Sequence, residues 1–360
     1  MNAAWHGRRV LVTGHTGFKG AWLCARLVRY GAHVVGLALP PEGAHNLWTA
    51  AKLEREVESH VADIRDLEAT ENVIAAANPE VVLHLAAQPL VRRSYREPVL
   101  TYATNVMGTV HVLDAVRRRT SAKAVVAVTS DKVYADAPLA HGYAEDARLG
   151  GADPYSGSKA AAELIVETYR KAYYSGGRGP ALASARAGNV IGGGDFSEDR
   201  LLPDFFRALE AGQPMVVRQP DAIRPWQHVL DPLDGYLLLA EALLAEPQRY
   251  AQAWNFAPEA AVPVRDVLAH FADAWGIAGG AAYTFEPSSE HETHRLEIDA
   301  TKSSELLGWQ SRWSVEPAVA QTASWYRDYL AGMPATELVE RDLLAYDQAK
   351  AASFNVRTLK

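Results

Sequence analysis

The sequence lacks several features that would assign it to particular classes of protein. Its only cysteine, Cys24, excludes a disulfide framework and a cysteine-based zinc site. The segment His291-Glu292-Thr293-His294 is one residue short of the zinc motif H-E-x-x-H, so we expect no metal. No apolar run approaches the roughly 20 residues that span a bilayer, and the start of the chain holds no apolar signal core.

Positive charge is also scarce. Acidic side chains outnumber basic ones, 43 to 36, which gives a formal net charge of −7. A nucleic-acid-binding protein needs a basic surface that neutralises phosphates, so no nucleic-acid partner is expected. Together with the missing membrane and signal segments, this composition predicts a cytoplasmic enzyme or binding protein.

Strand-like and helix-like segments alternate through the first half of the chain. Apolar strands are expected at 9–12, 33–39, up to Asp63, 81–85, 124–128 and 181–186. Helices are expected over 18–30, from Asp66 to before Pro79, and over 98–119 and 155–174. This alternation predicts an α/β fold with a doubly wound parallel sheet. The rhythm breaks after Asn189, which predicts a smaller C-terminal α/β lobe.

A glycine-rich turn follows the first expected strand. Gly14, Gly17 and Gly20 have the spacing G-x-x-G-x-x-G. Glycines allow a tight bend, and the N-terminus of the next helix attracts a pyrophosphate. This placement favours a Rossmann-type dinucleotide site over a plain βα turn. The second strand ends in Ala38-Leu39-Pro40-Pro41, without the carboxylate that selects NAD or an arginine for a 2′-phosphate. We expect NAD, held weakly at the ribose.

A group of polar residues, Thr129-Ser130-Asp131-Lys132, follows the fifth expected strand, at the sheet edge where ligands bind. Tyr155 and Lys159 are four residues apart and share a helix face. A neighbouring ammonium stabilises a phenolate, which lowers the pKa of the tyrosine toward that of a useful general base. A second pair with this spacing, Tyr346 and Lys350, is expected on a solvated helix face, so the spacing alone is uninformative.

Several motifs in order make residues 8–330 resemble the extended short-chain dehydrogenase/reductase superfamily. They are the glycine turn, the Asp63 strand end, His84-Leu85-Ala86-Ala87, Asn105-Val106-Met107-Gly108-Thr109 and Tyr155-x-x-x-Lys159. Within the superfamily, the chain is most similar to nucleotide-sugar 4,6-dehydratases that act on CDP-glucose. The segments that carry this similarity are 14–20, 88–92, 129–132, 185–195 and 224–229.

The resemblance implies a reaction without net redox change. Tyr155, assisted by Ser130 and Lys159, takes the proton of the sugar C4 hydroxyl while NAD accepts a hydride. Asp131 protonates the C6 hydroxyl that leaves as water, and the hydride returns to C6 to give CDP-4-keto-6-deoxyglucose. Lys132 stands where many such dehydratases carry a glutamate that removes the C5 proton. The sequence leaves open whether Lys132 is this base, stabilises an enolate, or forms an ion pair.

The resemblance also implies binding residues. Those for NAD are Gly14, Thr16, Gly17, Phe18, Lys19, Gly20, Asp63, Ile64, Leu85, Ala86, Ala87, Asn105, Tyr155 and Lys159. Those for the nucleotide sugar are Gln88, Arg92, Asn189, Arg224 and Asn255. Arg224 suits a diphosphate because a guanidinium binds phosphate oxygens bidentately, with a structural salt bridge as the alternative. For Asn189 and Asn255 the alternative is turn chemistry.

The same resemblance implies a division of the chain and an assembly. Residues 1–187 and 229–256 form the NAD-binding Rossmann domain, 188–228 and 257–335 form the nucleotide-sugar lobe, and 336–360 form a C-terminal tail. The helices at 98–119 and 155–174 pair across a two-fold axis in a homodimer. The product leads to deoxysugars such as those of lipopolysaccharide O-antigen.

Other functions remain open at this point. A nucleotide-sugar 4-epimerase or reductase on the same scaffold would keep Tyr155 and Lys159 but would need neither Asp131 nor Lys132. A dehydratase for another NDP-hexose is also compatible, because the shape of the base pocket is not readable from the sequence. A non-catalytic NAD-binding scaffold would have no need of Ser130 beside the Tyr155 pair.

Overall fold

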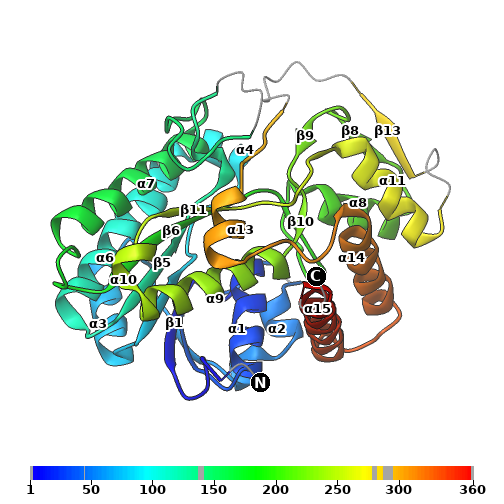
Figure 1. Ribbon diagram of the computed structural model, residues 1–360. Coiled ribbons are helices and arrows are strands. Elements are labelled where there is room, and N and C mark those ends of the chain that lie inside the picture. Colours follow the sequence, from blue (N-terminus) through cyan, green and yellow to red (C-terminus); the bar gives the residue numbers. More distant parts are fainter. Residues whose placement is uncertain (1–2, 44, 137–141, 278–281, 287–294, 358–360) are drawn as a thin grey trace.

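A seven-stranded parallel sheet forms the centre of the molecule (Figure 1). The computed structural model describes residues 3–43, 45–136, 142–277, 282–286 and 295–357. In spatial order the strands are β11 (Ala253–Phe256), β6 (Ala181–Ala187), β5 (Ala124–Val128), β4 (Val81–His84), β1 (Arg9–Thr13), β2 (His33–Ala38) and β3 (Glu58–Val61). This order reverses direction at β1, as in a doubly wound Rossmann sheet. The predicted fold class is confirmed.

Helices cover both faces of the sheet. Along β1, Val10 and Val12 pack into the core beneath α1 (Phe18–Arg29) and α9 (Leu230–Ala245), whereas Leu11 packs on the opposite face. That second face is covered by α3 (Leu67–Ala77), α6 (Gly108–Arg119) and α7 (Pro154–Ala172) (Figure 1). The central strands β1, β4 and β5 are apolar on both sides because both faces are buried there, whereas the edge strand β3 is polar and mostly exposed.

Two elements differ from the sequence-based expectations. The third strand ends at Val61, because the Asp63 carboxylate binds the backbone N–H of Arg65 at 2.9 Å in a turn that leads to α3. The helix expected over 98–119 is divided into α5 (Pro98–Tyr102), a π-helical turn η2 (Ala103–Met107) and α6. The π-helical turn lies at Asn105, a position that the site uses.

The smaller elements lie beside the carboxyl ends of the strands. Three two-stranded sheets pair β7 (Val190–Ile191) with β10 (Gln227–His228), β9 (Ile223–Arg224) with β12 (Val262–Pro263), and β8 (Met215–Val217) with β13 (Tyr283–Phe285). The helices here are α8 (Leu201–Glu210), α11 (Val264–Trp275) and α14 (Val315–Leu330) (Figure 1). The short helices elsewhere are α2 (Leu47–Ala50), η1 (Leu53–Arg55), α4 (Val91–Arg96), η3 (Asp131–Val133), α10 (Pro247–Tyr250) and α13 (Thr301–Leu307).

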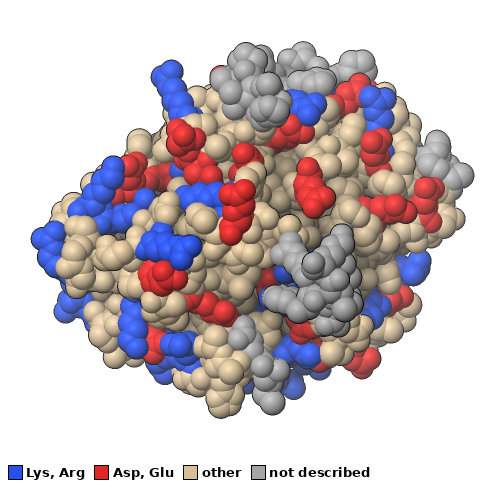
Figure 2. Space-filling model, viewed as in Figure 1, with Lys and Arg blue, Asp and Glu red and all other residues tan. Residues whose placement is uncertain are grey.

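Charges of both signs are interspersed on the face of the molecule in Figure 2. Several ion pairs of the described residues join neighbouring turns of one helix, such as Lys171 with Glu167 and Arg118 with Asp114. Within the described residues, no helix is both long and apolar enough to cross a bilayer.

The C-terminal helix α15 (Ala335–Arg357) packs against the sheet domain, which corrects the expectation for Tyr346 and Lys350. Tyr346 is fully buried and donates a hydrogen bond to Asp231 Oδ1 at 2.9 Å. Lys350 Nζ lies 2.7 Å from Asp234 Oδ1. The sequence pattern could not show this, because the two carboxylates lie on α9 and are buried there. Buried carboxylates require donors, and one face of α15 supplies them.

A buried arginine joins this cluster to α1. Arg26 is fully buried, and its Nη2 lies 3.3 Å from Asp234 Oδ1 and 3.1 Å from Asp347 Oδ1. Its guanidinium also packs 5.0 Å from the centre of the Tyr346 ring. Burial raises the pKa of Asp231 to about 6, despite hydrogen bonds that favour its charged form. The cluster therefore ties the first, ninth and last α-helices together.

We expect Arg26→Met to lower the free energy of unfolding by about 3 kcal/mol, because a buried carboxylate on α9 loses one of its cations. Arg29→Met on the same helix is the matched control. The Arg29 partners on α15 are partly exposed, so its loss should cost about 1 kcal/mol or less. Urea unfolding at neutral pH measures both, and equal losses would argue against a special role for Arg26.

Candidate active site

The glycine turn lies against the loop that follows β4. Gly14 has a φ of +75°, and a Cβ there would lie 2.8 Å from the backbone nitrogen of Ala86. A Cβ on Gly20 would lie 2.0 Å from the carbonyl oxygen of Gly14, so neither glycine accepts a side chain. Gly17 is the N-cap of α1, and no side chain caps this helix. The helix N-terminus is therefore available to an anion.

Thr13 joins the ends of β1 and β4 beside this turn. Its Oγ1 lies 2.7 Å from His84 Nδ1 and accepts hydrogen bonds from the backbone N–H groups of Leu85 and Ala86, at 3.2 and 3.1 Å. Leu85, Ala86 and Ala87 are half-buried. Burial lowers the pKa of His84 to about 3, so its ring is neutral.

Other residues that the sequence assigned to the cofactor lie near the ends of β2 and β3. Thr16 Oγ1 donates to the carbonyl oxygen of Leu39 at 2.9 Å. Hydrogen bonds from Arg65 hold the pKa of the Asp63 carboxyl below its ordinary value. Ile64 is buried, and a Cβ on Gly108 would lie 2.5 Å from its Cδ1. The Asp63 carboxylate is thus already engaged within the protein.

The π-helical turn places Asn105 between the β4 loop and α7. Asn105 Oδ1 accepts from the Gln88 backbone N–H at 2.8 Å, and Nδ2 donates to the Gln88 carbonyl at 3.1 Å and to Ser158 Oγ at 2.9 Å. Ser158 Oγ in turn donates to the carbonyl oxygen of Tyr155 at 2.7 Å. Turns of this type are frequent at functional sites. Asn105 therefore fixes the start of the helix that carries Tyr155.

The end of β5 and the start of α7 bring candidate catalytic side chains together. Ser130 Oγ donates to Asp131 Oδ1 at 3.0 Å and is hydrogen-bonded to the Tyr155 side chain. It also accepts from the backbone N–H of Lys132 at 3.2 Å as η3 begins. Lys132 itself is half-buried. The serine thus links the tyrosine to the carboxylate.

Tyr155 does not have the lowered pKa that its spacing from Lys159 predicts. Burial raises the pKa of the Tyr155 hydroxyl, while the hydrogen bond with Ser130 and the positive charge of Arg200 act in the opposite direction. Lys159 Nζ donates to the carbonyl oxygen of Val128, at 3.3 Å. The predicted direction is wrong, because desolvation of the phenolate outweighs the nearby positive charges.

Asp131 is a buried carboxyl with one unused oxygen. Burial raises its pKa, and the charges of Lys132 and Arg224 oppose this shift. Among the described residues, its Oδ2 has no hydrogen-bond partner. A Cβ on Gly188 would lie 3.1 Å from this oxygen, so the glycine leaves room beside it. Asp131 is therefore suited to hold a proton and to present it to a bound molecule.

Lys19 interacts electrostatically with Lys159 and Asp131. Its Nζ donates to the Tyr236 hydroxyl at 2.8 Å. Burial lowers the pKa of Lys19 to about 7, with further lowering by the charges of Lys159 and Arg200 and a smaller opposing effect of Asp131. The glycine turn thus places a cation near the catalytic groups.

A cavity of about 90 Å³ lies between β7, α8 and the 195–203 segment. Gly192 lines this cavity, and the half-buried Phe18 lies near Gly192. Trp226 also lines the cavity, and its indole Nε1 has no partner among the described residues. The lining residues are Asn189, Val190, Ile191, Gly192, Asp195, Asp199, Arg200, Leu201, Leu202, Pro203 and Trp226.

Of the residues predicted to bind the nucleotide sugar, two are connected to this cavity. Asn189 lines it, and Arg92 is ion-paired at 2.9 Å with Asp199, which also lines it. Arg224 is buried two residues before the lining residue Trp226, and its Nη1 donates to the carbonyl oxygen of Ile223 at 2.8 Å.

The other two predicted residues are used inside the protein. The Gln88 side chain donates to Thr101 Oγ1 at 2.8 Å and accepts from the Leu90 backbone N–H at 2.6 Å. The Asn255 amide accepts from the Tyr134 hydroxyl at 2.7 Å and donates to two backbone carbonyl oxygens at 2.9 Å. The structure therefore does not bring these two side chains to the cavity.

Sequence reasoning missed two charged residues at the site. Arg200 precedes α8 and acts electrostatically on both Tyr155 and Lys19. Glu163 lies on α7, four residues after Lys159, and raises the pKa of Lys159. No sequence motif marks Arg200, whereas the i, i+4 spacing of Glu163 from Lys159 is a signal that could have been used.

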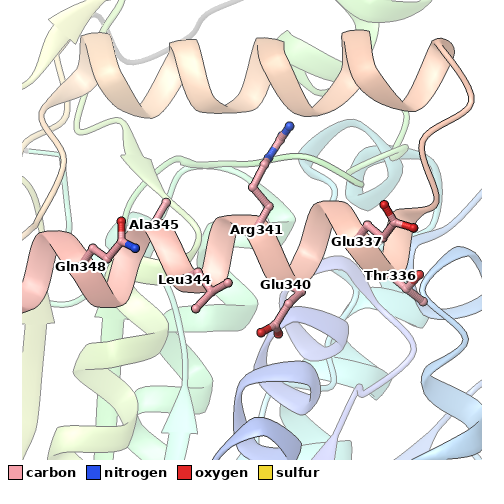
Figure 3. A pocket seen from close by; sticks show the side chains of 7 residues that line it. All are labelled: Thr336, Glu337, Glu340, Arg341, Leu344, Ala345 and Gln348. Carbon is pink, nitrogen blue, oxygen red and sulfur yellow. The ribbon is translucent and has the colours of Figure 1, made fainter.

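The segment His291–His294 lies outside the described residues, among which no group of three or more histidine, cysteine or acidic side chains could hold a metal. A shallow hollow on α15 holds no predicted site residue, and Figure 3 shows Arg341 in it pointing toward α14, where it pairs with Asp328.

The parallel sheet, the glycine turn and the Ser130–Tyr155–Lys159 set together define an extended short-chain dehydrogenase/reductase. Residues 11–322 match the model of the family described as GDP-mannose 4,6 dehydratase, and the chain belongs to this family. A CDP-glucose 4,6-dehydratase of Salmonella typhimurium is 43% identical over 352 residues, which cover 96% of this chain and 98% of that protein. A UDP-glucose 4-epimerase of Mycolicibacterium smegmatis is 31% identical, over 89% of this chain and 99% of its own.

Solved structures agree on the fold. DesIV, a dTDP-glucose 4,6-dehydratase from Streptomyces venezuelae with NAD and TYD bound, superposes with a TM-score of 0.76. It is 23% identical, and the match covers 91% of this chain and 99% of DesIV. A Thermus thermophilus UDP-glucose 4-epimerase in complex with NAD also has a TM-score of 0.76, at 24% identity over 89% of this chain and 99% of its own.

Two glycines of the turn allow a matched pair of substitutions that tests its geometry. Gly20→Ala should lower the free energy of unfolding by about 3 kcal/mol, because its methyl group overlaps the Gly14 carbonyl oxygen and forces the turn apart. Gly17→Ala should cost about 1 kcal/mol or less, since its Cβ would meet only that oxygen, at 3.4 Å. Urea unfolding of the two variants checks this. A Gly20→Ala protein as stable as Gly17→Ala would contradict the geometry.

Proposed function

We propose that this protein is an NAD-dependent hydro-lyase that converts CDP-D-glucose to CDP-4-keto-6-deoxy-D-glucose and water. The observation that carries the proposal is the buried Asp131 carboxyl, joined through Ser130 to Tyr155. Epimerisation needs the tyrosine but no second acid. The similarity of nearly the whole chain to a CDP-glucose 4,6-dehydratase supports the choice of substrate.

The residues present fit a dinucleotide. Gly14 and Gly20 form a turn that a Cβ would block, and the N-terminus of α1 has no side-chain cap. These are the features that hold a pyrophosphate. We assign NAD to this turn, with the loop 85–87, Asp63, Ile64 and Lys159 nearby. Bound NAD supplies the acceptor for the C4 hydride and returns that hydride to C6.

Tyr155 is assigned the proton of the C4 hydroxyl. Loss of this proton together with a hydride turns the alcohol into a ketone. Burial opposes formation of the phenolate, so the Ser130 hydrogen bond and the Arg200 charge, which both lower the pKa of Tyr155, carry the activation. Lys159 lies one turn further along the same helix face.

Asp131 and Lys132 are assigned to the elimination. The 4-keto group acidifies the C5 hydrogen. Removal of that proton and departure of the C6 hydroxyl with a proton from Asp131 release one water and leave a C5–C6 double bond. The raised pKa of Asp131 favours the protonated acid that this step needs. Lys132, the next residue, is assigned the C5 proton, which its side chain can accept only as the uncharged amine. Addition of a hydride at C6 and return of a proton to C5 complete the product.

Part of the nucleotide sugar is assigned to the cavity between β7 and α8, which Asn189 lines and which is too small to hold the whole molecule. Arg92, paired with the lining residue Asp199, and Arg224 are assigned to the rest of the nucleotide sugar. This supports a lobe formed by 188–228 and 257–335, set against a Rossmann domain of 1–187 and 229–256, with residues 336–360 as a C-terminal segment. A cytoplasmic location is part of the proposal, because NAD and CDP-glucose are highly charged and do not cross a bilayer unaided. The product would feed the synthesis of deoxysugars, such as those of O-antigen.

Incubation with a panel of NDP-hexoses tests the proposal. Mass spectrometry should show the loss of one water from CDP-glucose without net consumption of NAD. Conversion to an epimer without a mass change would replace the proposed function with epimerisation.

The role of Tyr155 is tested by Tyr155→Phe. This variant keeps the ring and removes the ionisable oxygen, so kcat should fall about 10²–10⁴-fold with KM little changed. Near-normal turnover by Tyr155→Phe would show that the tyrosine does not take the C4 hydroxyl proton.

Lys132→Ala separates oxidation from elimination. If Lys132 takes the C5 proton, the variant should still oxidise C4, seen as reduced nicotinamide on mixing. Exchange of the C5 hydrogen with solvent deuterium should fall about 10²-fold or more, as for loss of a general base, and water loss should fall with it. Normal water release would exclude Lys132 from the mechanism. Failure to reduce nicotinamide would move Lys132 to binding or oxidation.

A homodimer is also proposed. Large apolar side chains are exposed on α4, α5 and α7, at Tyr95 (62%), Val99 (82%) and Leu164 (54%), as expected of a face that a second copy covers. Val99→Glu should therefore convert a dimer to a monomer in light scattering at micromolar concentration. Leu344→Glu on α15, where the side chain is 42% exposed, is the control and should leave the mass unchanged. A monomeric wild-type protein would refute the assembly.

A further inference from the structure

Two successive turns of α7 hold two successive residues at the end of β5. Lys159 Nζ donates to the carbonyl oxygen of Val128, at 3.3 Å. One turn further, Glu163 accepts a hydrogen bond from the Thr129 hydroxyl through Oε1. Ser130 follows directly. The position of this serine relative to the tyrosine on α7 therefore depends on these two contacts.

The second oxygen of Glu163 is bound to β6. Oε2 accepts from Ser184 Oγ at 2.8 Å and from Arg186 Nη2 at 2.7 Å. Both members of this ion pair are almost completely buried, with side chains 3% and 4% exposed. The Arg186 guanidinium continues to the Tyr134 hydroxyl at 2.8 Å. One carboxylate thus joins α7 to two neighbouring strands.

We propose that Glu163 is a positioning residue for the proposed dehydration. Its carboxylate fixes the end of β5 against α7 and supplies the negative charge that balances the Lys159 ammonium. The effect on turnover rests on the function proposed above, whereas the effect on the lysine does not.

The charges around Lys159 explain why this balance is needed. Burial lowers the pKa of Lys159 to about 8, and Glu163 opposes this shift. The neighbouring groups from other elements are Lys19 of α1, whose charge repels the ammonium, and His84 of β4, which is neutral. Glu163 in turn faces Arg186 of β6 and Arg170 of its own helix.

The first test is the pH profile of kcat. In Glu163→Gln, the fall of kcat on the alkaline side should move to lower pH by about one unit, because Lys159 loses its proton more easily. Glu167→Gln, one turn further along α7 at an exposed ion pair with Lys171, is the matched control and should keep the wild-type profile. An unchanged profile in Glu163→Gln would overturn the charge role.

A second variant isolates the mechanical role. Thr129→Val removes the hydrogen bond to Glu163 and keeps every charge. It should lower kcat about 10-fold through misplacement of the adjacent Ser130, with KM and the alkaline limb unchanged. Full activity in Thr129→Val would show that the contact does not position the serine.

Stability against pH tests the charge balance without any substrate. The folded-state pKa of Lys159, about 8, lies below the ordinary value of 10.5 for a lysine side chain. Removal of Glu163 therefore costs most stability where Lys159 is charged, below about pH 7, and that part of the cost disappears as pH rises through about 8. The difference in urea midpoint between Glu163→Gln and wild type should shrink over this range. A difference that is constant with pH would mean a purely structural role.

A second comparison applies if the Glu163→Gln variant does not fold. If Glu163→Gln does not fold, Glu163→Gln/Arg186→Met removes both charges of the buried pair, a change that proteins often tolerate, and the comparison is made against Arg186→Met alone. If the wild-type protein dehydrates no NDP-hexose, the proposed function fails, while the stability comparison still decides the role of Glu163.

Discussion

Burial of ionisable groups near the carboxyl ends of β1, β4 and β5 is the constraint on which the candidate active site depends. Burial raises the pKa values of the Asp131 carboxyl and the Tyr155 hydroxyl, and lowers those of Lys19 and Lys159 to about 7 and about 8. The pKa values of the two amines thereby approach neutral pH, where proton transfers need little free energy, and the raised pKa of the carboxyl favours its protonated form. The pKa of the Tyr155 hydroxyl shifts away from neutral pH instead. The hydrogen bond with Ser130 and the charge of Arg200 oppose this shift.

Buried charged groups also require partners. These partners connect parts of the fold that hydrophobic packing alone would allow to shift relative to one another. Carboxylates on α9 receive donors from α1 and α15. Asn105 connects the β4 loop to α7 through a π-helical turn. Each connection includes an aspartate or asparagine, a short side chain with well-defined donors or acceptors. Such a contact fixes geometry more strictly than contact between aliphatic groups. These polar contacts therefore help to fix the relative positions of the helices they join.

The strands, the glycine turn and the Tyr155 helix could be predicted because their signals are local: an apolar run, a spacing of glycines, a helix that follows a polar strand end. Features that depend on distant partners could not. Asn255 matches the position of a substrate ligand, yet its amide meets Tyr134, 121 residues away in the sequence. The solvated face expected for Tyr346 is buried, since its partner Asp231 lies on another helix. The direction of the Tyr155 pKa failed for a related reason, because desolvation is a property of the assembled fold rather than of helical spacing.

The ion pair between Arg26 and Asp347 spans 321 residues of sequence. During synthesis, α1 emerges from the ribosome long before α9 and α15, which supply every carboxylate that this guanidinium meets. Until α9 has been made, docking of α1 on the nascent sheet would bury the Arg26 cation without a counter-ion. The order of translation therefore opposes early closure of the N-terminal half. Contacts of such high sequence separation also slow folding, and Arg26 has both of these carboxylate partners only after α15 has been made.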